Sequence, residues 1–462
     1  MASIRIPAET LRVQEELDLL VIGGGSAGVT AAVTGARLGL RTGLVEEMPG
    51  LGGMSTGGAV GTYCGFYKKG PGATLVPTVG GLPLEIADSL LARGHAIGPI
   101  PLHDTAVLPY VPMGVQHLLE ELVRREPRLR VRLHSRLTHV LVDEGLVRGV
   151  AVDTRGERIG LRARVYVDAS GDAVLSRLAG VETLREGTLQ YPSMMFTMQN
   201  VDVARAIGAI RSLPGLLESH FVSDQLPRRS GNLIPTGRPG EVLVALSRVE
   251  FEGRPVDAAV EQELSFAELE GRAQAVRLAE FVRREIPGFA DAFLSHTASR
   301  LGVRETRKIA GEYVLREDDV LGARDFADGI GRCAWPIERH VAGGHTSWSF
   351  LEPGASYAIP FRCLVPRGVD NLLVAGALPL RRQHRLRFGS RDRTLHAGRT
   401  GRRRRRAADL HRRRRNEPRR RGAAARDALR LGRSAVMDRR RAAAHAGTGR
   451  TSSRRQRERP AG

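Results

Sequence analysis

One short stretch constrains the fold of this 462-residue chain more than any other: an apolar run that passes directly into a glycine turn. Residues 17–22 are nearly all Leu, Val or Ile, as in a buried parallel strand. The turn that follows reads Gly23-Gly24-Gly25-Ser26-Ala27-Gly28. Small residues after it favour a helix through Leu38, and a second strand is expected over residues 42–45. The sequence therefore predicts a strand, turn, helix and strand of an α/β fold.

The turn has the GxGxxG spacing of a dinucleotide-binding site, and each glycine has its own role. Gly23 permits the tight turn, Gly25 lets the backbone approach a pyrophosphate, and Gly28 allows close packing of the helix, whose N-terminus carries partial positive charge. Glu46 ends the second strand and can accept both hydroxyl protons of an adenosine ribose. The candidate cofactor contacts of this unit are Gly23, Gly25, Ser26, Ala27, Gly28 and Glu46. The alternative is an ordinary glycine-rich turn.

A second glycine loop lies shortly after Glu46. It reads Leu51-Gly52-Gly53-Met54-Ser55-Thr56-Gly57-Gly58. Glycines without side chains, together with the hydroxyls of Ser55 and Thr56, are what a backbone must offer to lie against a planar ring and a phosphate. The alternative is a surface loop. An acid, a short spacer and Gly-Gly in this order resemble the FAD-dependent oxidoreductases of the glutathione-reductase-like fold.

This resemblance covers most of residues 17–376. More narrowly, the sequence resembles bacterial flavoproteins related to the flavin subunit of heterodisulfide reductase. More distantly, it resembles fumarate reductase flavoproteins. The resemblance implies FAD as the cofactor. It also implies that the second loop continues along the FAD through Gly52, Gly53, Met54, Ser55, Thr56 and Gly57.

Two later segments match further FAD elements of the resembled family. A strand ending in Asp168-Ala169-Ser170-Gly171-Asp172 corresponds to the family's second FAD contact. There, Gly171 would allow close approach of the cofactor, and Asp172 would either contact it or cap the following helix. The strand that ends in Ala375 and Gly376 corresponds to the family's last pass into the FAD sheet.

Between these segments the sequence favours a helix over residues 115–125 and a three-stranded meander over residues 131–140, 146–152 and 159–163. Residues 165–168 are expected to return as a separate strand. Together the patterns predict an α/β protein: a Rossmann-like FAD/NAD(P)-binding domain with a β-meander insertion, plus an α+β substrate domain. The expected boundaries are 1–184 for the first part of the FAD domain, 185–350 for the substrate domain, 351–376 for the returning strand and 377–462 for a tail.

Three residues of the substrate domain are candidates for catalysis. Arg304 and Arg307 lie in a segment that the resemblance places near the flavin, and their guanidinium groups match a carboxylate bidentately. A structural ion-pair network with Glu305 and Glu312 is the alternative. His340, in a segment similarly placed in the family, is the first candidate for an acid or base, and His345 is the weaker one.

The cysteines and the N-terminal residues limit which other classes of protein and cofactor are possible. Cys64, Cys333 and Cys363 are too far apart in sequence for a disulfide framework or a zinc knuckle, so we expect no metal and a reducing, cytoplasmic environment. No CxxC group is present, which argues against an iron–sulfur cluster within this chain. No secretory signal or membrane span is visible.

The C-terminal 86 residues differ from the rest of the chain. Residues 377–462 contain 30 Arg, no Lys and 6 acidic residues, whereas residues 1–376 carry 41 basic and 44 acidic residues. All of the net charge of +21 therefore comes from the tail. With ten Leu, Val, Phe or Met and no Trp or Tyr, the tail is expected to be disordered.

We interpret this tail as the correct gene read in the wrong frame. The chain holds 68 Arg and only 3 Lys, which indicates GC-rich coding DNA. CGN arginine codons read one base later give Ala, Gly, Val or Asp, and one allowed set of codons after Gly376 spells a family-like ending with G-Q-A-A-G. The competing interpretation is a genuine arginine-rich arm that binds nucleic acid, but it lacks aromatic residues for base stacking, and we do not expect it to function so.

The leading functional expectation is a flavoenzyme that transfers a hydride or two electrons between FAD and an unidentified small substrate. Only one GxGxxG is present, so no second nicotinamide domain is expected and the electron-transfer partner is unknown. The alternatives are an NAD-dependent dehydrogenase, or a degenerate flavin-fold binding protein that has lost its C-terminal FAD element.

Overall fold

The computed structural model describes residue 4 and residues 8–184, 189–223, 226–340, 344 and 346–376. The predicted tail over 377–462 lies outside the described residues, and so does His345.

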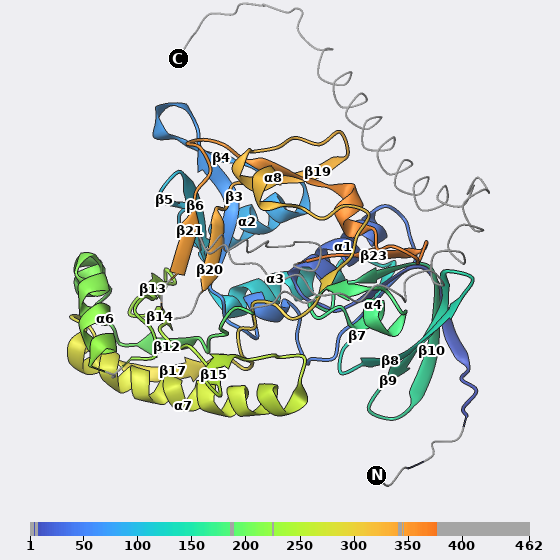
Figure 1. The fold of residues 1–462 in the computed structure, drawn as a ribbon, viewed down its shortest axis with the longest axis horizontal. Coiled ribbons are helices and arrows are strands. Elements are labelled where there is room, and N and C mark those ends of the chain that lie inside the picture. Colours follow the sequence, from blue (N-terminus) through green and yellow to red (C-terminus); the bar gives the residue numbers. More distant parts are fainter. Residues whose placement is uncertain are drawn as a thin grey trace, which may run out of the picture. The chain divides into compact units, whose positions relative to one another are not determined.

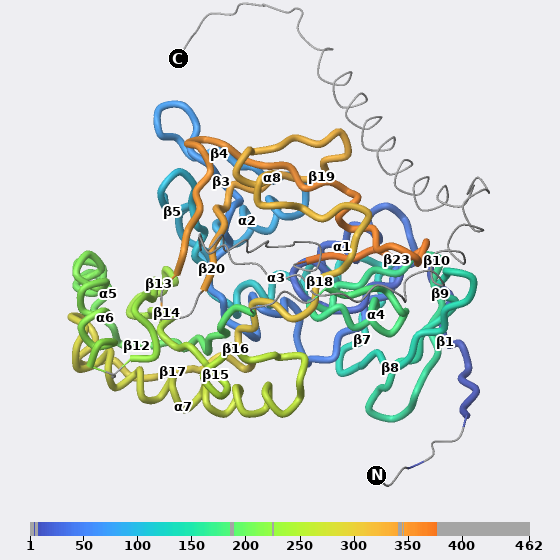
Figure 2. Tube along the Cα trace, viewed as in Figure 1, coloured from blue at the N-terminus to red at the C-terminus, as the bar shows by residue number. Residues whose placement is uncertain are grey.

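A seven-stranded sheet positions both glycine loops (Figure 1). Five of its strands are parallel and lie in the order β7 (Leu129–Arg132), β2 (Thr42–Val45), β1 (Val13–Ile22), β10 (Arg158–Asp168) and β23 (Leu372–Val374). The hairpin of β8 (Arg136–Asp143) and β9 (Leu146–Asp153) is antiparallel and pairs with the first half of β10. The second half of β10 pairs with β23, which comes from far along the chain (Figure 2).

The two faces of this sheet bury alternate side chains of β1, as the period of a strand requires. Leu19 and Val21 belong to the apolar cluster on the side of the helices α1 (Ser26–Arg37), α2 (Leu82–Ala92) and α3 (Pro112–Arg124). Leu20 and Ile22 belong to the cluster on the side of α4 (Val174–Leu178). Small residues bring α1 close to the sheet, since a methyl group on Gly35 would lie 2.5 Å from Cδ2 of Leu19.

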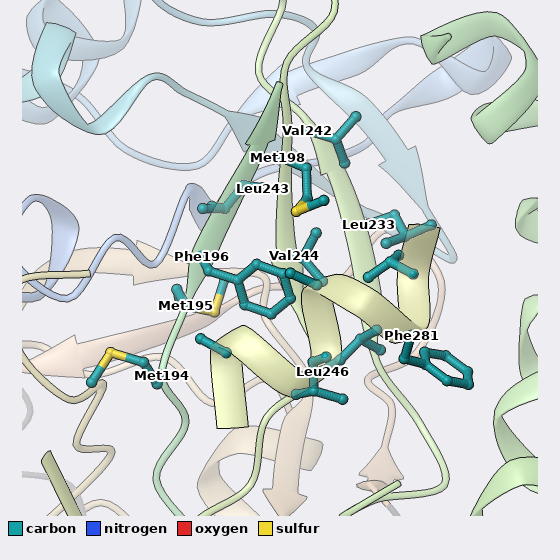
Figure 3. Close-up of a cluster of buried hydrophobic side chains, with 14 of the residues drawn as sticks. Met194, Met195, Phe196, Met198, Leu233, Val242, Leu243, Val244, Leu246 and Phe281 are labelled. Carbon is teal, nitrogen blue, oxygen red and sulfur yellow. The ribbon is translucent and has the colours of Figure 1, made fainter. Parts of the chain in front are cut away.

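A separate antiparallel sheet carries the largest apolar cluster. Its strands lie in the order β13 (Asn232–Pro235), β14 (Val242–Ala245), β12 (Phe196–Gln199) and β17 (Phe293–Thr297). The long helix α7 (Glu261–Glu285) runs along it, and Figure 3 shows Phe281 of this helix among the buried methionine, leucine and valine side chains of the strands and of the segments that flank them. The helices α5 (Val203–Gly208) and α6 (Leu213–Val222) complete the cluster.

A further four-stranded antiparallel sheet follows the second glycine loop, in a region for which the sequence patterns made no prediction. Its order is β4 (Leu75–Pro77), β3 (Thr62–Lys69), β6 (Thr105–Pro109) and β5 (Ile100–Leu102). Four strand pairs are smaller: β11 (Thr183–Leu184) with β18 (Lys308–Ile309), β15 (Glu250–Phe251) with β16 (Arg254–Pro255), β19 (Gly329–Cys333) with β22 (Tyr357–Pro360), and β20 (Ile337–His340) with β21 (Thr346–Ser349). The remaining helical elements are α8 (Glu317–Leu321), η1 (Gly53–Ser55), η2 (Pro71–Ala73), η3 (Ala209–Arg211) and η5 (Phe361–Leu364).

The structure confirms the predicted class, an α/β fold with a Rossmann-like parallel sheet and additional antiparallel sheets, and corrects the meander. The expected strand over 131–140 is two elements, because β7 joins the parallel sheet beside β2 and only β8 belongs to the hairpin. The expected separate strand at 165–168 is the second half of the continuous strand β10. Both errors arise because an alternating pattern does not reveal where a strand changes its partner.

Candidate functional site

Gly23 and Gly28 of the first turn are required by the space around them. Gly23 has a φ of +102°, and a methyl group there would lie 2.4 Å from the carbonyl oxygen of Ala169. A methyl group on Gly28 would lie 1.8 Å from the carbonyl oxygen of Gly23. Gly25 is less confined, because the nearest atom to such a methyl group, Cα of Gly53, is 4.0 Å away. The turn is thus held tightly against the end of β10 and open at Gly25.

The helix that follows presents an uncapped N-terminus. Its N-cap is Gly25, which has no side chain, and its first turn contains no acidic residue. The N–H groups and the partial positive charge at this end are therefore not neutralised by side chains of the helix itself. The hydroxyl of Ser26 lies 2.8 Å from that of Ser55, so the helix start contacts the second glycine loop. This arrangement suits an anionic ligand such as a pyrophosphate.

Glu46 directly follows β2 and turns its carboxylate toward the glycine turn. Its Oε2 accepts a hydrogen bond from the N–H of Gly24 at 2.5 Å, and its Oε1 accepts one from the N–H of Met48 at 2.8 Å. The residue is buried. A carboxylate has about four acceptor positions, so two are left for other donors. These positions suit the two hydroxyls of a ribose.

The second glycine loop is joined directly to the first. The N–H of Gly52 donates to the carbonyl oxygen of Gly24 at 2.8 Å, and Gly25 and Gly52 form a parallel bridge. Gly52 and Gly53 have φ values of +107° and +56°. Further along, the hydroxyl of Thr56 donates to the carbonyl oxygen of Leu51 at 2.8 Å, so the loop closes on itself.

The far end of this loop contacts the region predicted to bind substrate. The carbonyl oxygen of Gly57 accepts the N–H of Arg300 at 3.1 Å and the hydroxyl of Ser299 at 3.2 Å. At Gly58, a methyl group would lie 2.9 Å from Sδ of Met54, so the Met54 side chain packs along the loop. The loop therefore runs from the start of α1 to the segment that contains Arg304.

Two tyrosines beside these loops were missed by the sequence analysis. Tyr63 of β3 is partly buried, and its hydroxyl interacts with Ser55 and Ser26, although burial still raises the pKa of Tyr63. The ring of Tyr110 lies 4.5 Å from that of Tyr63. The hydroxyl of Tyr110 is buried without a hydrogen-bond partner in the described part of the chain. The sequence around Tyr63 shows no periodic pattern that could have identified it.

The ends of β10 and β23 meet the same helix start. The N–H of Ala375 donates to the carbonyl oxygen of Asp168 at 2.9 Å. Gly376 has a φ of +89°, and a methyl group there would lie 3.7 Å from Cβ of Ala27. Gly171 has a φ of +82° with open space where a side chain would be. The second glycine loop, the end of β10 and the end of β23 thus all lie near the N-terminus of α1.

The cap of the helix after β10 comes from other residues than expected. Asp168 is fully buried and accepts the N–H of Ser176 at 2.8 Å, and the hydroxyl of Ser170 accepts the N–H of Val174 at 3.0 Å. Asp172 instead accepts the hydroxyl of Thr306 at 2.8 Å, and burial raises its pKa. The capping interpretation of Asp172 is therefore wrong, while contact with a cofactor stays a prediction.

The two candidate arginines have different hydrogen-bond partners in the structure. Arg304 donates through Nε to the carbonyl oxygen of Tyr191 at 3.0 Å and through Nη2 to the hydroxyl of Ser193 at 3.4 Å. Arg307 donates to the carbonyl oxygen of Asp172 at 3.3 Å.

The alternative ion-pair network takes a different form. Glu305 pairs with Lys308 at 3.3 Å and accepts the N–H of Gln190 at 3.0 Å. Glu312 is joined to the fold through its backbone, which donates to the carbonyl oxygen of Val365.

His340 ends β20 in a buried polar environment. Its Nε2 lies 3.1 Å from Oε1 of Glu338, and its Nδ1 lies 3.3 Å from the hydroxyl of Thr346. Its backbone N–H donates to the side chain of Gln190 at 3.1 Å. Burial lowers the pKa of His340 below its ordinary value, and Glu338 offsets this only in part. Burial alone would raise the pKa of Glu338, but His340 and Arg304 hold it below its ordinary value.

Strand β3 connects this pair to the glycine loops. Tyr63 contacts Ser55 of the second loop, whereas the next residue, Cys64, is close enough to Glu338 to feel its charge. Burial, with a smaller effect from Glu338, raises the pKa of Cys64 to about 12, so this thiol stays protonated. The glycine loops and His340 therefore belong to one neighbourhood.

Two further arginines of this neighbourhood were not predicted. Arg228 and Arg248 are only 7% and 6% exposed. Arg248 lies in the run 242–249, which is apolar except for Ser247 and Arg248, and an arginine in such a run is a signal that could have identified it. Arg228 lies in a polar loop and carries no comparable signal.

Within the part of the chain that the structure describes, no three His, Cys, Asp or Glu side chains are grouped to hold a metal ion. In the same residues, no helix is long and apolar enough to cross a membrane.

Comparison with known proteins gives one family. Residues 18–378 match the family described as FAD dependent oxidoreductase. No curated protein matches this chain.

Several solved structures resemble parts of the chain. A geranylgeranyl bacteriochlorophyll reductase-like protein from Thermoplasma acidophilum is 17% identical, with a TM-score of 0.37, over 62% of this chain and 65% of its own. The p-nitrophenol 4-monooxygenase PnpA from Pseudomonas putida DLL-E4 is 14% identical, with a TM-score of 0.38, over 65% and 70%. The myxobacterial chondrochloren halogenase CndH is 18% identical, with a TM-score of 0.37, over 64% and 65%. The chain thus spans about two thirds of the length of these proteins.

Proposed function

Because this chain belongs to the FAD-dependent oxidoreductase family, we propose that it binds FAD along its two glycine loops and transfers a hydride or two electrons between the flavin and a small organic substrate. The observation that carries the proposal is the direct joining of the two loops, in which Gly52 donates to Gly24 while Glu46 accepts from Gly24. The two loops then form one joined backbone surface along which a dinucleotide can lie.

The residues present fit an adenine dinucleotide. Glu46 keeps two acceptor positions for the ribose, and the uncapped start of α1 suits the pyrophosphate. Gly25 leaves open the space that a side chain would fill. Beyond the loops, the hydroxyl of Tyr110, which has no hydrogen-bond partner among the described residues, can donate to a polar group of the ligand.

The residues proposed to hold FAD are those of the two loops and of the two strand ends. They are Gly23, Gly25, Ser26, Ala27, Gly28, Glu46, Gly52, Gly53, Met54, Ser55, Thr56, Gly57, Gly171, Asp172, Ala375 and Gly376. When bound, FAD supplies the redox chemistry by accepting or donating a hydride or single electrons.

His340 is proposed to exchange a proton with the substrate. Its lowered pKa keeps the imidazole neutral near pH 7, so it can accept a proton. Glu338 faces Nε2 at 3.1 Å and would stabilise the imidazolium that forms. The Nδ1 atom, which contacts Thr346, is then the atom available for proton exchange.

Arg304 is proposed to bind the substrate, and Arg307, through the carbonyl oxygen of Asp172, to keep the end of β10 in place. The comparisons give no support to an NAD-dependent dehydrogenase. The narrower kinship with heterodisulfide reductase and fumarate reductase flavoproteins, the cytoplasmic location, the absence of an iron–sulfur cluster and the electron-transfer partner stay predictions.

The test is the absorption spectrum of the purified protein. An oxidised-flavin band that is bleached by dithionite and recovers in air, with FAD released on heating, supports the proposal. A protein that stays colourless and takes up no added FAD even when the frame is restored after Gly376 would refute it.

A further inference from the structure

Three arginines that no sequence motif connects gather around Glu338 and His340: Arg228 and Arg248 are buried, and Arg304 is partly buried. Arg228 follows α6, Arg248 follows β14, and Arg304 precedes β18. Burial, together with the charges of Arg304 and Arg248, lowers the pKa of Arg228 to about 10, and both Arg304 and Arg228 lower the pKa of His340. These effects require the side chains to be close to one another.

A line of hydroxyl groups connects Arg228 to His340. The Nη2 atom of Arg228 donates to the hydroxyl of Ser230 at 3.3 Å, Ser230 lies 3.3 Å from the hydroxyl of Thr346, and Thr346 lies 3.3 Å from Nδ1 of His340. A group bound by Arg228 would therefore lie close to the residue proposed to exchange a proton.

The cluster carries more positive than negative charge. Arg248 stacks 3.5 Å above the ring of Tyr191 and lies 3.1 Å from Glu250. Glu338 faces His340 and Arg304. Among the described residues, Arg228 has no acidic side chain within ion-pair distance and one hydrogen bond, to Ser230. A buried guanidinium with a single weak partner is costly unless an anion completes its shell.

We propose that Arg228, with Arg248 and Arg304 beside it, binds a carboxylate of the substrate, so that the substrate is a small organic carboxylate. This inference rests on the proposed function, since it names the substrate class of that site. Apart from its one hydrogen bond to Ser230, the Arg228 guanidinium has N–H groups left, and a guanidinium can bind a carboxylate through two parallel hydrogen bonds. We favour a carboxylate over a phosphate because Arg228, a single cation without an acidic partner among the described residues, balances one negative charge. The test below therefore includes phosphate as a competing ligand.

The first measurement needs no variant. The full chain with bound FAD is titrated with succinate, benzoate, inorganic phosphate, succinamide and benzamide at constant ionic strength, and the melting temperature and flavin absorbance are followed. We expect a carboxylate to raise the melting temperature, and its amide to have no effect. If no carboxylate of the panel binds more tightly than its amide, or if phosphate binds in preference to both carboxylates, the proposal is overturned.

The second measurement assigns the binding to Arg228. We expect Arg228→Met to weaken carboxylate binding at least tenfold and Arg228→Lys to weaken it less. The control is Arg211→Met, which removes an exposed arginine of η3 in the same part of the fold. Equal loss in Arg228→Met and Arg211→Met, with both variants folded by circular dichroism, would contradict the assignment.

Failure of this inference and failure of the proposed function give different results. A flavin-containing protein that ignores every carboxylate refutes the substrate class alone. A protein that binds no FAD but binds carboxylates through Arg228 refutes the proposed function alone.

Discussion

The carboxylate of Glu46 connects the first glycine turn to the end of β2. It accepts two backbone N–H groups and keeps two acceptor positions toward the expected ribose. Its neighbour Glu47 is exposed and takes no part in these bonds. Comparing substitutions of Glu46 and Glu47 therefore distinguishes the effect of a carboxylate bonded to the turn from the effect of a negative charge near it.

Replacing Glu46 by Ala is expected to raise the Kd for FAD by about 10- to 100-fold, because hydrogen bonds to a charged group contribute about 1.5–3 kcal/mol. The Kd is measured by quenching of flavin fluorescence on binding to apoprotein. Glu47→Ala serves as the control and should bind FAD as the unchanged chain does. Equal affinity of the two variants would argue against Glu46 as a ribose ligand.

His340 allows a test of the electrostatics that needs no substrate. Because burial outweighs Glu338, the His340 imidazole should titrate below its ordinary value of about 6.5. Glu338→Gln removes the group that raises this pKa, so the midpoint should move further down. The measurement is a histidine NMR titration, with the resonance assigned by its loss in His340→Gln. A midpoint that stays in place or rises in Glu338→Gln would contradict this geometry.

At the scale of elements, the site depends on how closely α1 approaches β1 and β10. Gly28 is the closest point, since a methyl group there would lie 1.8 Å from a backbone oxygen that cannot move aside. Strand β10 serves two purposes along its length. Its first half holds the β8–β9 hairpin, and its second half holds β23, which brings Ala375 and Gly376 to the helix start.

Gly28→Ala is expected to lower the free energy of unfolding by about 3 kcal/mol, because the helix must move away from the turn. Flavin retention should fall with it. The matched control is Gly215→Ala in α6, where a methyl group meets nothing within 4 Å and a gain of up to about 1 kcal/mol is expected. Denaturant unfolding measures both. If Gly28→Ala is as stable as the unchanged chain, as the control is expected to be, the close approach of the helix is contradicted.

At the scale of the whole molecule, the parallel sheet needs the chain to return to it after the region predicted to bind substrate. Strand β23 makes this return, and the match to the family ends at residue 378, just past its last residues. This supports the proposal that the reading frame changes after Gly376, although the tail itself lies outside the described residues.

A chain restored in frame after Gly376 is expected to carry more flavin per mole than the chain as given, because the helix that follows in the resembled family would then face the flavin. Absorbance at the flavin band relative to protein, taken after gel filtration, measures the difference. Equal occupancy would count against the prediction. Resequencing the DNA across the codon for Gly376 tests the frame directly.

Some parts of the fold could be predicted from the sequence and others could not, because some contacts join residues close in sequence and others join residues far apart. The glycine turn, α1, β2 and Glu46 were predictable, since the residues that define them are close in sequence and their backbone geometry permits few alternatives. The partner change along β10 was not, because alternation shows which face of a strand is buried and not which strand lies beside it.

The sequence by itself determined the class of fold and the two glycine loops, and only the tertiary structure decided the surroundings of His340. Arg304 and Arg307 look like a pair when read in order, yet the segment between β17 and β18 is not helical, so the side chains contact different partners. Arg228 and Arg248 belong to the neighbourhood although they come from the distant segments that follow α6 and β14. Their convergence follows from the packing of distant segments, which no local pattern encodes.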